Sequence, residues 1–192
     1  SPEKAVAIQE DLGADCITSQ VERDRVARLN LVAARRSRAS SAPASALNYA
    51  GTALGLMGPG RYAREPALAL ELQLIRAECS VLVGDLALAD ADLTELQAID
   101  LPWVDRAAVV RQWMVLCVMR SDYGSAVAAA LQALQTQGTM LTPHPAPEQV
   151  QAAYEVVMSL LDRRSIEALI DLPLCTDADI TAAMSVLAEL FA

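Results

Sequence analysis

The sequence predicts an all-α protein in which antiparallel pairs of helices stack into an α-solenoid. Composition is the first indication: 54% of the 192 residues are apolar, mostly Ala and Leu, against one Phe, two Trp and four Tyr. Ala and Leu head the helix-propensity scale, whereas residues that favour strands are few. The second indication is the helical spacing of apolar residues, and the third is an internal repeat.

The first predicted helix pair surrounds a stretch of small residues. Ser19 and Glu22 have the spacing of a capping box, so a long helix is expected from about residue 20 to 37. A second helix is expected over residues 46–57, because the Gly and Pro residues at 58–60 end it.

Two longer segments carry apolar residues on two neighbouring helical stripes. Between residues 68 and 82 the stripes are Leu68, Leu72, Ile75, Cys79 and Leu82, and beside them Leu70, Leu74, Ala77 and Val81. Between residues 104 and 119 they are Val109, Trp113 and Leu116, and beside them Ala107, Val110, Met114 and Cys117. A helix that is apolar over two stripes packs between neighbours, so both segments are expected in an inner layer.

Shorter helices complete the predicted order. Each inner helix is followed by one, at about residues 86–97 and 123–137. After turn-rich residues come a helix at 147–162, a short helix at 165–170 and a last helix opened by Thr176 with Asp179 three residues on. No strand is expected.

An internal repeat relates the turns after the inner helices and the helices that follow them. At an offset of 37 residues, Gly84, Leu86, Ala89, Leu93 and Leu96 match Ser121, Tyr123, Ala126, Ala130 and Ala133. A weaker third copy is formed by Pro43, Ala46, Ala50 and Ala53. A small turn residue followed by Ala where two helices approach is typical of tetratricopeptide-like repeats, which have a period of about 34 residues. The alternative is a chance alignment of Ala-rich helices.

Several stretches also resemble a known group of proteins. They include ERDRVARLNL at 22–31, PHP at 143–145 and RSIEALIDLP at 164–173, with shorter matches at 70–72, 77–78, 84–85 and 122–123. Together they resemble the tetratricopeptide-like helical region of large bacterial signalling proteins that join a serine/threonine kinase, an AAA-type ATPase, a GAF sensor and a histidine kinase. Where that family carries a His and an Asn, this chain has Asp11 and Gly13.

The resemblance implies a place for the chain between the ATPase module and the sensor and kinase modules. Its implied role is docking or relay within signal transduction, with those modules or a signalling protein as partners. Residues 1–192 are predicted to form a single helical-repeat domain. Within it, residues 1–18 are the tail of a preceding module, 19–138 form the helix pairs, and 139–192 form capping helices.

Charge and composition disfavour several partners. A net charge of -9 opposes binding to nucleic acid and to anionic membrane surfaces, which both need clustered Lys and Arg. No apolar run reaches the roughly 18 residues of a membrane span. The four cysteines lie far apart and predict no disulfide framework. We therefore expect a cytoplasmic protein with neither nucleic acid nor membrane as partner.

No catalytic, cofactor or metal site is predicted. The glycines between residues 55 and 60 lack the following Lys of a phosphate-binding loop. His144, the single histidine, lies between two prolines without a second metal ligand nearby. Paired carboxylates such as Asp90 and Asp92, or Asp177 and Asp179, are interpreted as a solvated helix face and a helix start.

The predicted function is a non-catalytic protein-interaction or coupling module. Stacked pairs form a concave surface lined by the first helix of each pair, where Gln73, Arg76, Arg111 and Gln112 are the polar interruptions. These four residues are predicted to contact a protein partner. The alternative is a purely structural spacer or a dimerisation element, hence a homodimer, with no ligand in the groove. An exposed apolar patch at one end of the stack would favour that alternative.

Overall fold

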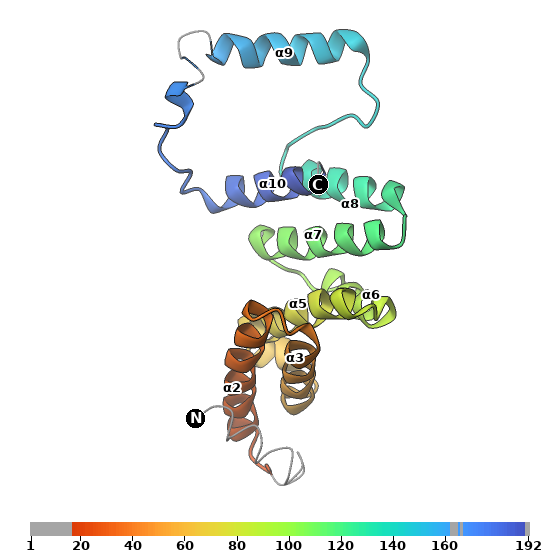
Figure 1. The fold of residues 1–192 in the computed structure, drawn as a ribbon, viewed down its shortest axis with the longest axis vertical. Coiled ribbons are helices and arrows are strands. Elements are labelled where there is room, and N and C mark those ends of the chain that lie inside the picture. The colour runs from red at the N-terminus through yellow and green to blue at the C-terminus, as the bar shows by residue number, and fades with distance from the viewer. Residues whose placement is uncertain (1–16, 162–164, 166, 191–192) are drawn as a thin grey trace.

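Helices make up the architecture of the chain (Figure 1). A computed structural model describes residues 17–161, 165 and 167–190. These residues form nine α-helices and one 3-10 turn, with no strand among them. The expected all-α class is therefore confirmed for the described part of the chain. The predicted tail at residues 1–18, with Asp11, Gly13 and Cys16, lies almost wholly outside it.

The helices begin and end close to the predicted residues. Their bounds are α2 (Gln20–Ala39), α3 (Pro43–Met57), α4 (Arg61–Arg64), α5 (Pro66–Val83), α6 (Leu86–Gln97), α7 (Trp103–Met119), α8 (Tyr123–Thr136), α9 (Pro147–Leu161) and α10 (Ala178–Glu189). The 3-10 turn spans Glu167–Leu169, where a short helix was expected. The four-residue helix α4 was not predicted, because it is shorter than one period of an apolar pattern.

Capping differs from the prediction at two helix starts. Ser19 precedes α2 as expected, but its side chain makes no capping hydrogen bond, so the capping box with Glu22 does not form. At α10 the cap is Asp177 rather than Thr176, because the Asp177 Oδ1 accepts hydrogen bonds from the amides of Asp179 and Ile180. A carboxylate at this position also interacts favourably with the helix dipole.

Three of the turns between helices share one backbone geometry. Each contains one residue with positive φ, namely Ser41 (55°), Gly84 (85°) and Ser121 (59°). The amide that follows each of them donates to the carbonyl five residues earlier, with N to O distances of 2.9, 2.8 and 2.8 Å at residues 42, 85 and 122. This bond satisfies the open carbonyls at the end of the preceding helix. The same device therefore ends α2, α5 and α7.

The positions after these turns are buried in the same register. Five, nine and twelve residues after each positive-φ residue, every side chain is at most 6% exposed. These residues are Ala46, Ala50 and Ala53 in α3, Ala89, Leu93 and Leu96 in α6, and Ala126, Ala130 and Ala133 in α8. The internal repeat thus corresponds to one local structure formed three times, and chance alignment does not account for it.

From α2 to α8, each long helix packs against the next long helix along the chain, and the short α4 packs on α5. The pair α2 and α3 contacts α5, the pair α5 and α6 contacts α7, and α10 packs on the pair α7 and α8 (Figure 1). Three apolar clusters fill the successive interfaces. The core is therefore continuous from layer to layer, and the whole is a helical repeat.

The two C-terminal helices behave differently. Helix α10 covers α7 and α8 with its buried residues Ala182 and Val186. Helix α9 buries none of its residues and lies beyond α8 and α10, apart from the body (Figure 1). Within the predicted capping segment 139–192, α10 thus packs on the α7 and α8 pair, whereas α9 covers no layer.

Candidate protein-docking groove

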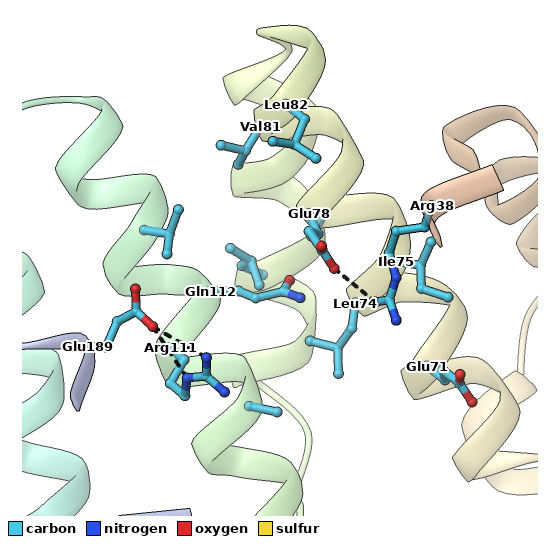
Figure 2. Close-up of a pocket in the computed structure, with 14 residues that line it drawn as sticks. Arg38, Glu71, Leu74, Ile75, Glu78, Val81, Leu82, Arg111, Gln112 and Glu189 are labelled. Carbon is cyan, nitrogen blue, oxygen red and sulfur yellow. Dashed lines mark hydrogen bonds and ion pairs between the residues drawn. The ribbon is translucent and has the colours of Figure 1, made fainter. Parts of the chain in front are cut away.

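A groove lies between α5 and α7, the first helices of the second and third pairs (Figure 2). Its volume is about 530 Å³. Arg38 from the end of α2 and Glu189 from the end of α10 close its two sides. The first helices of two successive pairs thus line it.

The floor of the groove is apolar. Leu74, Val81 and Leu82 of α5 face Ala108 and Val115 of α7 across it. Leu82 is 64% exposed and Val115 is 37% exposed, so this apolar surface is open to water. Leu74 and Val81 belong to the second apolar stripe of α5. Leu82 ends the first stripe, whose other members pack in the cluster that α5 shares with α2 and α3.

Ion pairs flank the apolar floor. The Nη1 of Arg38 lies 3.0 Å from the Oε2 of Glu78, and Arg111 contacts the Oε2 of Glu189 at 3.4 Å (Figure 2). Exposed pairs of this kind each contribute little to stability, about 0–1 kcal/mol. They do fix the position of charge, because each joins two helices and holds its guanidinium at the groove edge.

One polar group in the groove wall lacks a partner among the described residues. The side chain of Gln112 lies between α7 and α5 (Figure 2), and its Oε1 atom is buried without a hydrogen bond. A buried carbonyl left unpaired costs about 1–3 kcal/mol. The atom has no surface open to the groove, so this cost falls on the packing of α7 against α5 rather than on a bound segment.

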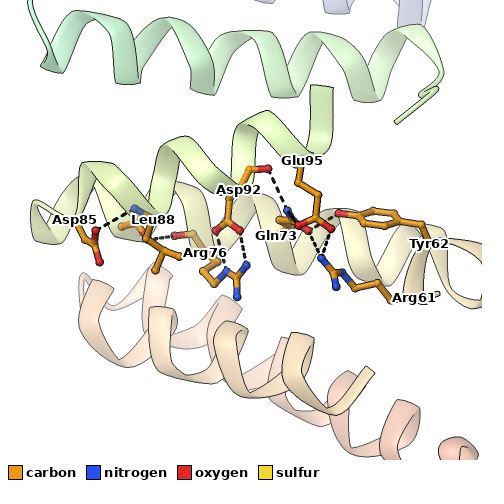
Figure 3. Close-up of polar contacts among 9 residues, drawn as sticks. Arg61, Tyr62, Gln73, Arg76, Asp85, Leu88, Asp92 and Glu95 are labelled. Carbon is orange, nitrogen blue, oxygen red and sulfur yellow. Dashed lines mark hydrogen bonds and ion pairs between the residues drawn. The ribbon is translucent and has the colours of Figure 1, made fainter. Parts of the chain in front are cut away.

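The structure corrects the placement of Gln73. This side chain is fully buried between α5 and α6 and does not reach the groove (Figure 3). Its Nε2 donates to the carbonyl of Asp92 at 3.1 Å and to the Oε2 of Glu95 at 2.9 Å. Its Oε1 accepts from the hydroxyl of Tyr62 and from Arg61 at 3.3 Å. Burial raises the pKa of the Tyr62 hydroxyl to about 12.

Arg76 is likewise misplaced by the prediction. Its guanidinium turns toward α6 and forms a two-point ion pair with Asp92 (Figure 3). Burial raises the pKa of the Asp92 carboxyl, and the hydrogen bonds from Arg76 offset part of that rise. Gln73 and Arg76 therefore hold one helix pair together. The sequence contained a sign of this pairing. Gln73 and Arg76 are three residues apart on α5, and their partners Asp92 and Glu95 are three residues apart on α6.

Of the four predicted contact residues, Arg111 and Gln112 line the groove. Their role in binding stays a prediction. Sequence reasoning did not select Arg38 or Glu78, which also line the groove. Arg35 and Arg38 are one helical turn apart on α2, and they pair with Glu71 and Glu78 of α5. This spacing of charges could have indicated the pairing between the two helices.

Other reactive groups are dispersed. Among residues 17–161, 165 and 167–190, no three His, Cys, Asp or Glu side chains come together to hold a metal ion. Cys79 and Cys117 are buried free thiols, and burial raises the pKa of each. Cys175 is a free thiol on the surface. His144 lies in the exposed turn before α9.

None of the helices in the described ranges combines the length and the apolar character that crossing a membrane requires. No protein-family model, no curated protein and no solved structure matches this chain.

Proposed function

We propose that the chain is a non-catalytic, tetratricopeptide-like docking module that binds a protein segment in the groove between α5 and α7. The observation that carries the proposal is the combination of an open apolar floor and charged edges. The tetratricopeptide-like assignment is supported by the three equivalent turns and their equally buried small residues.

The groove suits a segment with one apolar face. Amphipathic helices bind by laying apolar side chains along such a floor, while their polar flanks meet charges at the rim. Here Leu82 and Val115 offer exposed apolar surface, and Arg38 and Arg111 lie at opposite edges. Polar flanks on the bound segment would meet these arginines and their carboxylate partners.

The resemblance supplies the expected partners, which are the neighbouring ATPase, sensor and kinase modules of a bacterial signalling protein. In that setting the module couples those parts of one chain. We also place the protein in the cytoplasm, where the free thiols of Cys79, Cys117 and Cys175 stay reduced.

The proposal is tested by calorimetric titration of the chain with the ATPase and sensor modules of the protein it resembles. Val115→Glu places a charge on the groove floor and is expected to weaken binding at least tenfold. Val104→Glu is the matched control, since Val104 is 43% exposed on the same helix but lies outside the groove lining. Arg111→Glu should weaken binding by a smaller factor.

Equal effects of Val115→Glu and Val104→Glu, or no binding of either module, would contradict the groove as a docking site. The second of these results would favour the other candidate function, a spacer or dimerisation element without a groove ligand. The observation in favour of that candidate is the uncovered apolar surface at the C-terminal end of the body, where Ile180 and Met184 are more than half exposed.

A further inference from the structure

Helix α10 is held to the body by few buried side chains. Only Ala182 and Val186 of its residues are buried. In contrast, α5 buries nine residues, and α2 and α3 bury six each. Helix α10 is therefore the most lightly packed of the longer helices that form the body.

The chain between α8 and α10 adds no buried contact that would keep α10 in place. None of the described residues between 137 and 177 is buried. Helix α9, which lies in this stretch, stands apart from the body (Figure 1). Detachment of α10 therefore breaks only the contacts of α10 itself. A lightly packed element of this kind opens locally at a lower cost in free energy than global unfolding.

The surface beneath α10 is an apolar stripe along α7, completed by α8. Its α7 residues recur at spacings of four, three and four, which places them on one side of the helix. They are Trp103, Ala107, Val110 and Met114, and they pack in one cluster with Ala182 and Val186. The groove uses the neighbouring stripe of α7, with Ala108, Arg111 and Val115. The two surfaces of α7 are therefore distinct.

One polar contact fixes each end of α10 on α7. The Nε1 of Trp103 donates to the carbonyl of Asp179 at 3.0 Å. At the other end, Arg111 lies 3.4 Å from the Oε2 of Glu189 (Figure 2). The first acceptor is a backbone carbonyl, which every helix offers, whereas the second contact requires a carboxylate. Helix α10 itself contains no Lys or Arg. The surface thus accepts an acidic helix with small or branched apolar residues on one side.

We propose that this α7 and α8 surface is a helix-binding site with α10 as its removable occupant, and that a helix of a partner protein with the same pattern takes its place. The pattern is a pair of small or branched apolar residues at the spacing of Ala182 and Val186, followed after one turn by a carboxylate at the position of Glu189. Amphipathic helices bind to apolar surfaces in this way. Because α10 is tethered, its effective concentration is high, and it blocks the site until a partner helix competes with it. The site does not depend on a ligand in the groove.

The test uses a fluorescein-labelled peptide of residues 176–190 as the probe, titrated with the full chain and followed by fluorescence anisotropy. Val186→Asp places a charge in the interface and releases α10, so this variant should bind the probe at least tenfold more tightly than the wild type, whose own α10 occupies the site. Ala188→Asp is the matched control, because Ala188 is exposed on the same helix and the variant should bind the probe as the wild type does. Circular dichroism checks that the rest of the helices stay folded in both variants.

Two further measurements examine the carboxylate and the release of α10. A probe with Glu189→Gln should bind the Val186→Asp chain at least threefold more weakly, and this loss should vanish when the chain also carries Arg111→Gln. In the wild type, the amides of α10 should exchange their hydrogens at least tenfold sooner than those of α5.

Three outcomes would overturn the proposal: equal binding of the probe to the wild type and the Val186→Asp chain, no binding to either, or exchange of α10 as slow as that of α5. Adding Val115→Glu in the groove to the Val186→Asp chain should leave probe binding unchanged. Failure of this site is therefore distinct from failure of groove binding.

Discussion

Arg76 of α5 and Asp92 of α6 form a two-point ion pair across the interface of the second helix pair, with the Nε of Arg76 2.8 Å from one carboxylate oxygen. The two partners differ in exposure, because the Asp92 side chain is 2% exposed and that of Arg76 is 21% exposed. The carboxylate therefore depends on the arginine for its charge compensation. Loss of the arginine leaves a buried anion.

Arg76→Gln is expected to destabilise the fold by about 3 kcal/mol near neutral pH, because breaking a buried pair leaves one charge uncompensated. Burial already raises the pKa of Asp92, and loss of Arg76 raises it further. Folded Asp92 then keeps its proton above the ordinary value of 3.8, while the unfolded chain releases it. The free energy of unfolding of the variant should therefore fall, relative to wild type, as pH rises through that window. Urea titrations at a series of pH values measure this difference.

The control for this prediction is Arg76→Gln combined with Asp92→Asn. That pair of substitutions removes the Asp92 carboxyl, so its stability deficit relative to wild type should not grow as pH rises through that window. A deficit of Arg76→Gln alone that is the same in acid and at neutral pH would show that the buried carboxylate does not set the cost.

Apart from α2 and α4, the helices could be predicted from the sequence because each combines a helical apolar period with a Pro, Gly or Asp at one end or both. The internal repeat could also be predicted, because only small side chains fit where two helices approach closely. The positive φ at Ser41 and Ser121 was not predictable, because nothing in a serine signals it. The surrounding helices impose that conformation, which costs a non-glycine residue about 1–2 kcal/mol.

The groove was only partly predictable. Arg111 and Gln112 interrupt the apolar stripes of α7, and both line the groove. Gln73 and Arg76 interrupt the apolar stripes of α5 in the same way. Their side chains bind Asp92 and Glu95 of α6 instead, and so lie inside the α5 and α6 pair. Which side of a helix faces the groove depends on the rotation between successive pairs. A single sequence does not encode that rotation in any local pattern.

Ala89→Leu tests the packing of the repeated turn region. Ala89 is fully buried in α6, in the cluster that joins α5, α6 and α7. A larger side chain forces these helices apart, and overpacking of this kind costs about 1–3 kcal/mol. Ala91→Leu is the matched control two residues on, at an exposed position of the same helix, and should change stability by less than about 0.5 kcal/mol. Similar losses in both variants, measured by urea denaturation, would argue against close helix approach at Ala89.

Asp122 tests the cap of α8. Its carboxylate accepts hydrogen bonds from the side chain and the backbone amide of Ser125, and these hold the pKa of Asp122 below its ordinary value. The stabilisation is present above the ordinary value of 3.8 and is lost as pH falls through the folded value. Asp122→Asn keeps a capping oxygen but cannot titrate. The wild type should therefore melt at a higher temperature than Asp122→Asn near neutral pH.

The difference in melting temperature between wild type and Asp122→Asn should shrink in acid, because the protonated carboxyl and the amide are then both neutral. Thermal melts at matched pH values measure it. Asp122→Ala removes the cap altogether and should melt below the Asn variant at every pH. Parallel curves for wild type and Asp122→Asn would mean that the charge of Asp122 contributes nothing, and that the cap acts through hydrogen bonding alone.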